Sequence, residues 1–389
     1  MFRRDSSLVC TYPPGPVVSA RGVTLGTPPR WLSRLGHVAG LSYSWVLPGG
    51  PDQMQCTLQV PPQYRTEALN PGRIVRIFRG GSCIWDGKLD EPQPTTQGWT
   101  ITAHGAGNFG TDYRNIWTSW DQNSPVLAAV ARGLRWNVPT ISSTGLYLLQ
   151  QEDSGSQTIT DFLNLLTTYG GYSWYVGRGN VLSVFPLPNT ELPSAANRLL
   201  ITRSPLARTI AADINTLVAR YQATADDTTG TTGAVATYGL GGASVAASVA
   251  AHQPMEAYVD LTQSGVISLG TAQAAAAGVL TQFQRAAFTG SFTVQPGQLR
   301  TMGGAPVDLG SDQAGTVVRL LVSDYGYGGE VIPGPLQFIV GNYAYDDTTQ
   351  TATVTPLQTV AQSMASLLAA DFPGGAATGT AGAVAISAD

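Results

Sequence analysis

The sequence predicts a mainly β protein with small α+β insertions. The 389 residues include 45 glycines and 25 prolines, a share that implies frequent turns and many short strands. Runs of β-branched and aromatic residues, some of them alternating with polar residues, occur towards both ends of the chain. The clearest helical spacing is confined to two segments, 158–169 and 271–285. The length suits two or three domains of about 150 residues each.

Residues 1–108 are predicted to be β structure. Arg73–Arg79 is rich in β-branched residues, Gly80–Gly81 is a two-residue turn that needs positive φ, and Ser82–Asp86 returns as a second strand. In Trp99–Ala103 apolar residues alternate with threonines, as in a strand with one buried face. Several such strands within about 70 residues suggest a small barrel or sandwich.

Residues 109–198 are predicted to hold linking or inserted α+β units. The helix over 158–169 has apolar residues at i, i+3, i+4 and i+7. Thr158 is placed to cap the first turn of this helix, with Asp161 three residues further on. Two short apolar runs joined by a Gly-containing turn then predict a hairpin over 172–185.

Residues 199–358 return to β structure, with an inserted helix predicted over 271–285. The alanine content of this helix and its stripe of Val279, Leu280 and Phe283 favour helix. Residues 359–389 are predicted to form a C-terminal helix followed by a flexible tail rich in Gly, Ala and Thr. The strands expected in this part are Ile214–Gln222, Phe288–Val294, Thr316–Val322, Phe338–Tyr345 and Thr351–Pro356.

Composition excludes several classes of protein. Charged residues make up 12% of the chain and the net charge is −4, which argues against a basic nucleic-acid reader. A hydrophobic share of 43% can build a core, so a disordered acidic chain is not expected. The N-terminus lacks the apolar run of a signal peptide, and no stretch is long enough for a membrane span. Cys10, Cys56 and Cys83 are expected to be reduced thiols, in keeping with synthesis in a cytoplasm.

Residues that could carry catalysis are sparse. His37, His104 and His252 are not spaced as a metal pair, and no hydrolase, metalloprotease or phosphate-loop motif is present. Cys83 and His104 are weighed as a nucleophile and base, but nothing around either residue supports that pairing. We therefore predict a protein that is not an enzyme and has no cofactor.

Two pairs of aspartates resemble cation ligands. Asp226–Asp227 and Asp346–Asp347 each lie beside Thr or Gly in a turn. A hard-cation site draws on more oxygen ligands than one such pair supplies, so solvated loop tips are the favoured interpretation and no metal is predicted.

The densest basic cluster is Arg73, Arg76 and Arg79. On a strand Arg73 and Arg79 share one face and Arg76 lies on the other. Two interpretations stay open: a strand whose faces meet other subunits or a water-filled lumen, or an exposed edge guarded by charge. The tryptophans Trp117, Trp120 and Trp136 are interpreted as core in preference to a sugar-stacking platform.

The order of several short motifs resembles the baseplate hub, or minor tail protein, family at the tail tip of long-tailed phages of the siphovirus type. Each motif is weak alone, and the resemblance, which covers about residues 30–358, rests on their order and spacing. They are Gly72–Gly81 with Ile84–Leu89, Thr237–Gly239, Thr271–Ala274, Phe338–Val340, Tyr343–Asp346 and Thr353–Pro356.

The resemblance implies two tube-like β-barrel domains, 1–108 and 199–358, with two smaller domains between or around them. It implies a homotrimer whose six barrels match a hexameric tail tube and line a channel through which genomic DNA passes during ejection and host entry. The implied partners are the distal tail protein ring, the tape measure protein and tail-tip or central fibre proteins. The implied location is the virion tail tip, assembled in the host cytoplasm. A single lysine, Lys88, among 21 basic residues suggests a high-GC actinobacterial host.

Two rival functions remain open from the sequence. One is a carbohydrate-binding β-protein that recognises the host envelope through the tryptophan-rich segment. The other is a cell-wall hydrolase that uses Cys83.

Overall fold

The computed structural model describes most of residues 30–108 and 288–357 and parts of the rest of the chain. The residues that it describes are 8–12, 17–18, 24–25, 30–61, 67–105, 107–108, 158–161, 163–164, 172–177, 181–186, 197–201, 207–208, 214–223, 237–244, 249–250, 253–261, 266–285, 288–322 and 337–357.

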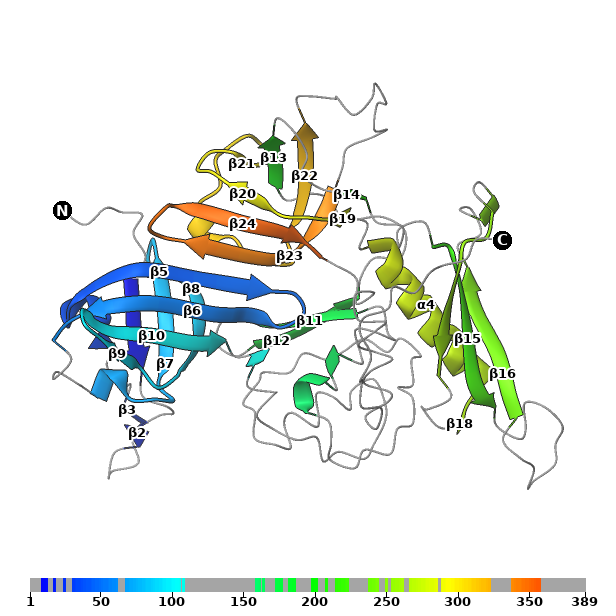
Figure 1. Ribbon diagram of the computed structural model, residues 1–389, viewed down its shortest axis with the longest axis horizontal. Coiled ribbons are helices and arrows are strands. Elements are labelled where there is room, and N and C mark those ends of the chain that lie inside the picture. Colours follow the sequence, from blue (N-terminus) through cyan, green and yellow to red (C-terminus); the bar gives the residue numbers. More distant parts are fainter. Residues whose placement is uncertain are drawn as a thin grey trace.

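One large curled sheet of 14 strands dominates the described structure, which confirms the mainly β prediction (Figure 1). Its main path runs β21-β13-β22-β23-β5-β6-β10-β8-β7-β1-β4, with β24 beside β23, β20 beside β24 and β9 beside β10. The strands are β1 (Leu8–Tyr12), β4 (Arg30–Trp31), β5 (His37–Val46), β6 (Gly50–Gln59), β7 (Ile74–Arg79), β8 (Ser82–Leu89), β9 (Gln93–Thr95), β10 (Gly98–Gly105), β13 (Asn197–Ile201), β20 (Phe292–Val294), β21 (Leu299–Thr301), β22 (Val317–Val322), β23 (Gln337–Asp346) and β24 (Thr351–Pro356).

The first half of this sheet forms because its strands alternate buried and less buried residues. In β5, Leu41, Tyr43 and Trp45 are all under 5% exposed, and the residues between them are half-buried. The predicted hairpin of β7 and β8 is confirmed, since Gly80 and Gly81 have φ of 55° and 84°. The inward residues of these strands share one core inside the curl.

Strand β23 joins the two ends of the chain into one sheet. It pairs with β5 in the register Tyr343↔Trp45 and Tyr345↔Tyr43, and with β24 along its other edge. The first residues of β23 also pair with β22. In Figure 1 the orange strands β23 and β24 accordingly lie beside the blue strand β5. The beginning and the end of the chain therefore share a single hydrophobic core.

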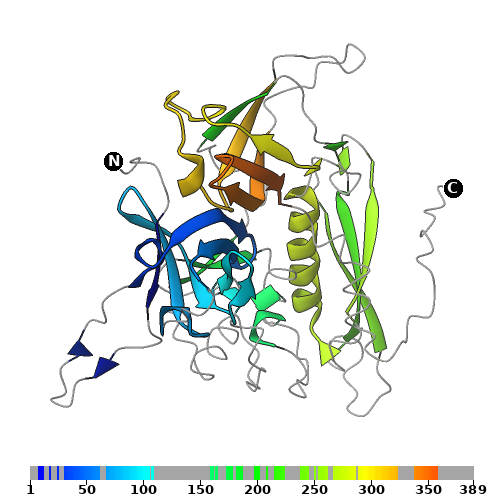
Figure 2. The same cartoon turned by 60° about the vertical axis from the view of Figure 1, so that its left-hand side comes forward.

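A second unit consists of a helix on a smaller sheet (Figure 2). Helix α4 (Leu269–Arg285) confirms the helix predicted over 271–285 and begins two residues earlier, after Ser268, whose Oγ accepts from Thr271 N at 3.2 Å. Buried residues of α4 recur at i, i+3, i+4, i+7 and i+8 from Ala272, and they pack on β15. The sheet consists of β15 (Thr216–Ala223), β16 (Thr237–Ser244), β17 (Glu256–Asp260) and β18 (Val266–Ile267).

Smaller elements complete the described structure. The predicted hairpin is present as β11 and β12, and it is attached to β6 through Gly49, whose N–H donates to Trp174 O at 3.0 Å. Thr158 and Asp161 form the predicted reciprocal cap, with Asp161 N donating to Thr158 Oγ1 at 3.1 Å and Thr158 N donating to Asp161 Oδ2 at 3.0 Å. The remaining elements are β2 (Val17–Val18), β3 (Thr24–Leu25), η1 (Leu32–Arg34), η2 (Glu67–Leu69), β11 (Tyr172–Gly177), β12 (Val181–Pro186), β14 (Ala207–Arg208), β19 (Phe288–Thr289) and η7 (Leu309–Ser311).

One predicted strand is divided in the structure. Phe288–Val294 was expected to be continuous, but it forms β19 and β20, which pair with different partners. Gly290 lies between them with φ of 115°, a conformation that breaks a strand. The prediction of one strand here is therefore wrong.

The division of the chain into domains at residues 108, 198 and 358 stays a prediction. Strands from 199–358 contribute to both sheets: β20 to β24 extend the large sheet, and β15 to β18 carry α4. The C-terminal helix and tail expected at 359–389 lie outside the described residues.

Candidate functional site

The most elaborate polar arrangement in the described structure surrounds Arg79, at the end of β7. Its Nε donates to Asp308 Oδ2 at 2.7 Å and its Nη1 donates to Asp347 Oδ1 at 3.1 Å. Its Nη2 donates to Gln350 Oε1 at 3.4 Å, and its guanidinium lies 5.3 Å from the centre of the Tyr345 ring. Arg79 is only 7% exposed. One side chain from the first quarter of the molecule thus connects two turns from its last quarter. We call this set the Arg79 junction.

The electrostatics of the Arg79 junction favour the charged guanidinium. Burial by itself would lower the pKa of Arg79, but the hydrogen bond with Asp308 and the negative charge of Asp308 raise it above its ordinary value. Burial also raises the pKa of Tyr345 to about 12, although the nearby charge of Arg79 opposes that rise. Arg79 is therefore a fixed cation held among acceptors, and Tyr345 stays a neutral phenol.

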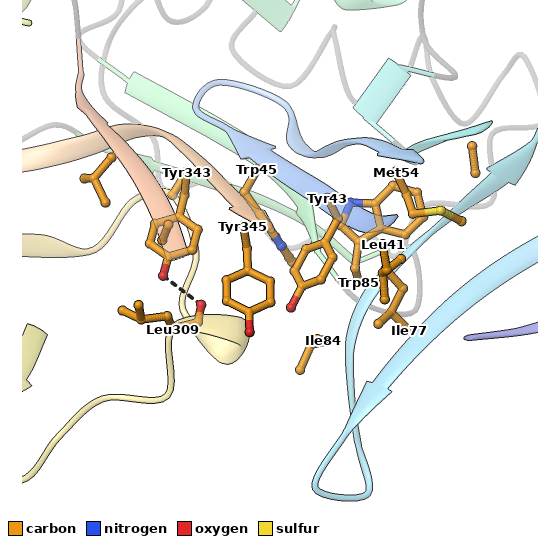
Figure 3. Packing of buried hydrophobic residues seen from close by; sticks show 14 of the residues in the cluster. Leu41, Tyr43, Trp45, Met54, Ile77, Ile84, Trp85, Leu309, Tyr343 and Tyr345 are labelled. Atoms are coloured by element: carbon orange, nitrogen blue, oxygen red, sulfur yellow. Dashed lines mark hydrogen bonds between the residues drawn. The ribbon is translucent and has the colours of Figure 1, made fainter. Parts of the chain in front are cut away.

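Two tyrosine hydroxyls fix the short helix η7 beside the Arg79 junction. Tyr343 donates to Leu309 O at 2.7 Å (Figure 3). Tyr43 donates to Gly310 O. A Cβ on Gly310 would lie 2.7 Å from Arg79 Cζ, so only glycine leaves room for the guanidinium. The junction therefore depends on β5, β7, β23 and η7 being correctly placed together.

Next to η7, Asp312 is held by three donors. Its carboxylate accepts from Gln313 N at 3.0 Å, from Thr316 Oγ1 at 3.2 Å and from Asn197 Nδ2 at 3.3 Å. Burial nevertheless raises the pKa of the Asp312 carboxyl, because desolvation of the charge outweighs these hydrogen bonds.

This raised pKa predicts a pH-dependent contribution to stability. Above the ordinary aspartate pKa, about 4, the unfolded chain loses a proton that folded Asp312 retains. The free energy of unfolding therefore falls as the pH rises from this value to the raised pKa of folded Asp312. Asp312→Asn removes that titration. We expect the free energy of unfolding of the variant to fall less between pH 4 and pH 7 than that of the wild type, measured by urea denaturation. Glu67→Gln, at an exposed carboxyl, is the control, and equal pH profiles for wild type and Asp312→Asn would contradict the expectation.

The alternation expected of the three arginines on a strand is observed, whereas their place at a subunit interface or lumen stays a prediction. Arg73 and Arg79 lie on the buried face with Val75 and Ile77, and Arg76 lies half-buried on the opposite face, in register with Asp86 on β8. The partners Asp308 and Asp347 were missed. A signal existed, because an arginine that shares a strand face with buried Val75 and Ile77 must enter the core beside an acceptor.

The other candidates occupy separate places. Cys83 Sγ lies 3.5 Å from Trp85 O. His104 pairs with Lys88 of β8, and its Nε2 lies 2.9 Å from Asp90 Oδ2. The structure does not bring Cys83 and His104 together. Burial raises the pKa of the Cys56 thiol to about 12. His37 is exposed at the start of β5, and His252 lies outside the described residues.

The aspartate pair of the β23–β24 turn has structural contacts. Asp346 Oδ1 accepts from Thr348 N at 2.7 Å, and Asp347 belongs to the Arg79 junction. Within the described ranges no group of three or more His, Cys, Asp or Glu side chains is arranged to hold a metal ion. No helix in the same part of the chain is long and apolar enough to cross a membrane. The pair Asp226–Asp227 and the tryptophans Trp117, Trp120 and Trp136 lie outside the described residues.

Comparison with known proteins gives a fold but no family. No family model matches the sequence, and no curated protein matches it. Among solved structures, the 43 kDa tail protein of prophage MuSo2 from Shewanella oneidensis has a TM-score of 0.55 at 11% identity, over 91% of this chain and 98% of that protein. A tail protein from Neisseria meningitidis MC58 has a TM-score of 0.55 at 10% identity, over 90% of this chain and 95% of that protein. Prophage tail protein gp18 from Listeria monocytogenes EGD-e has a TM-score of 0.54 at 12% identity, over 95% of this chain and 100% of that protein. The chain therefore shares its fold with these three tail proteins.

Proposed function

We propose that this chain is a structural protein of a phage tail. The observation that carries this proposal is the likeness in fold to three tail proteins, which extends over at least 90% of this chain and at least 95% of each of them. A likeness that spans at least 90% of this chain favours the same architectural role over a shared small module.

More specifically, we propose the trimeric hub of the tail tip of a siphovirus-type phage with an actinobacterial host. Three copies would adapt the hexameric tail tube to the tip or fibre and line the channel for DNA ejection. The partners would be the distal tail protein ring, the tape measure protein and tail-tip or central fibre proteins. The continuous sheet through β23 and the buried Arg79 junction support this role, since both connect the N-terminal strands β5 and β7 with the C-terminal part of the described chain.

In this role the chain carries out no catalytic step. Cys83 and His104, weighed as a nucleophile and base, each contact a different group. A cell-wall digestion assay with wild type and Cys83→Ala tests this, and cleavage that is lost in the variant would replace the structural role with an enzymatic one.

The first experiment on the proposed hub is a mass measurement. Purified full-length chain, analysed by light scattering after size exclusion, is expected to include a species of three times the 40.7 kDa of one chain. Imaging of intact virions that encode the chain is expected to place it at the tail tip with threefold symmetry. A stable monomer with no binding to tail-tube proteins, or density elsewhere in the virion, would contradict the hub.

Reversal of charge at Arg76 is expected to weaken the trimer. Arg76 lies half-buried on the face of β7 away from the core, where we place an inter-subunit seam or the lumen. A reversed charge at a closed interface costs several kcal/mol, so Arg76→Glu is expected to raise the trimer dissociation constant at least about tenfold. The control is Arg34→Glu, at an exposed arginine of η1, with unfolding midpoints measured for both variants. An unchanged trimer in a folded Arg76→Glu protein would remove Arg76 from the seam.

A further inference from the structure

Three arginines lie side by side at one end of the large sheet. The register aligns Arg198 on β13 with Arg300 on β21 and with Arg319 on β22. Paired residues of adjacent strands point to the same face, and neighbouring strands lie about 4.8 Å apart. The three side chains therefore form a row across β21, β13 and β22, the strands at the top of Figure 1. We call this row the arginine ladder.

Neutral groups hold the outer two arginines of the ladder. Arg300 donates from Nε to Gly297 O and from Nη1 to Gly304 O, each at 3.1 Å. With its amide oxygen turned towards the arginine, Gln337 accepts from Arg319 Nε at 3.0 Å and from Arg319 Nη2 at 2.8 Å. Both guanidinium groups are thus kept in place without any neutralisation of their charge.

The central arginine has an unmet requirement. Nε of Arg198 is buried and has no hydrogen-bond partner, and a Cβ built on Gly304 would lie only 2.9 Å from its Nη2. In the part of the chain that the structure describes, Arg198, Arg300 and Arg319 form no ion pair with a carboxylate. This differs from Arg79, which two carboxylates accept.

Such a row is unfavourable within a single chain. Like charges placed directly opposite one another in a sheet destabilise it, and a buried donor without an acceptor adds a further cost. All three arginines are half-buried, and partial burial weakens the screening of their charges by water. An anion laid along the row would offset the repulsion between the three charges, and arginine presents the forked donors that bind carboxylates in a bidentate manner.

We propose that the arginine ladder is a docking site for an acidic, extended segment of a partner polypeptide. Carboxylates at alternate positions of such a segment lie about 7 Å apart, which fits within a row of about 10 Å. Met302 in the turn after β21 is 42% exposed and offers an apolar contact next to the ladder. A nucleic acid fits less well, because strong phosphate binding usually needs more contacts than three and the whole chain has a net charge of −4.

The test measures binding of a fluorescein-labelled hexaglutamate peptide to the full-length chain by fluorescence anisotropy. Wild type is expected to bind, and Arg198→Gln is expected to weaken binding at least about tenfold, since a charge-assisted hydrogen-bonded contact is lost. Arg198→Lys keeps the positive charge but loses the forked donors of the guanidinium group. The affinity of this variant for the peptide is therefore expected to lie between those of wild type and Arg198→Gln. Arg34→Gln removes the same charge from an exposed arginine away from the ladder and is expected to bind as wild type does.

Several outcomes would overturn the proposal. One is a wild-type chain that does not bind the peptide, and another is an equal affinity for wild type and Arg198→Gln. Binding of a short DNA duplex that depends on Arg198, without binding of the peptide, would assign the ladder to nucleic acid instead. Thermal unfolding of each variant separates docking from structural support: docking predicts that Arg198→Gln keeps or raises the melting temperature. A large fall in melting temperature with unchanged peptide affinity would make the ladder structural. None of these readouts depends on the proposed tail role.

Discussion

Replacement of Arg79 by alanine is expected to lower the free energy of unfolding by about 3 kcal/mol. The side chain is 6% exposed, and it connects β7 with both Asp308 before η7 and Asp347 in the β23–β24 turn. Its removal leaves Asp347, which is itself only 19% exposed, facing a cavity without its cation. Urea denaturation of the full-length chain, followed by circular dichroism, measures the loss.

Two further variants separate the Arg79 junction from a general effect of charge. Arg34→Ala, at an exposed arginine, is expected to change the free energy of unfolding by no more than about 0.5 kcal/mol. Arg79→Lys keeps the charge but cannot reach Asp308, Asp347 and Gln350 together, so an intermediate loss is expected. If Arg79→Ala costs no more than Arg34→Ala, the junction does not hold the two ends of the chain together.

Replacement of Trp85 by alanine is expected to cost about 4 kcal/mol, the largest effect of any single substitution considered for this protein. Trp85 on β8 is fully buried, and its Nε1 donates to Ser44 O of β5 at 3.1 Å. In the sheet β6 and β10 separate β5 from β8, so this hydrogen bond crosses the inside of the curl. Figure 3 shows the indole among Leu41, Tyr43 and Met54. The variant thus loses apolar burial and also the hydrogen bond to Ser44 O.

The matched control for Trp85 is Trp31. Trp31 is half-buried and its ring lies 5.7 Å from that of Phe78, so Trp31→Ala is expected to cost about 1 kcal/mol. Trp85→Phe keeps much of the apolar volume but lacks the indole N–H, and we expect a loss between those of the two alanine variants. Denaturation midpoints measure all three. Similar losses in the free energy of unfolding for Trp85→Ala and Trp31→Ala would contradict the packing of Trp85 in the core inside the curled sheet.

Local features of the fold were predictable because they depend on neighbours in the sequence. The alternation in β5 and β7, the turn at Gly80–Gly81 and the cap at Thr158 each involve residues within a few positions of one another. Helix α4 was predictable for the same reason, from its alanines and its apolar stripe. The division of Phe288–Val294 was not, because glycine is tolerated in a continuous strand and only the pairing of β19 and β20 with different strands required the break.

The Arg79 junction was predictable only in part. The sequence indicated that Arg73 and Arg79 share a face, since residues two apart in a strand point the same way. It did not indicate the acceptors, because Asp308 and Asp347 follow Arg79 by 229 and 268 residues. Nothing local distinguishes them from other aspartates in turns. The Asp346–Asp347 pair accordingly suggested a solvated loop tip, whereas Asp347 accepts from a buried arginine.

The sequence by itself determined the mainly β character, the position of α4, the first hairpin and the face on which Arg79 lies. The tertiary structure alone decided which distant strands became neighbours. Strand β23 pairs with β5, and β13 enters the sheet between β21 and β22, which lie far from it in the sequence. The arginine ladder and the Arg79 junction both arise from these pairings. The physical reason is that backbone hydrogen bonds between strands are nearly independent of residue type, so partners are selected by how the whole core packs.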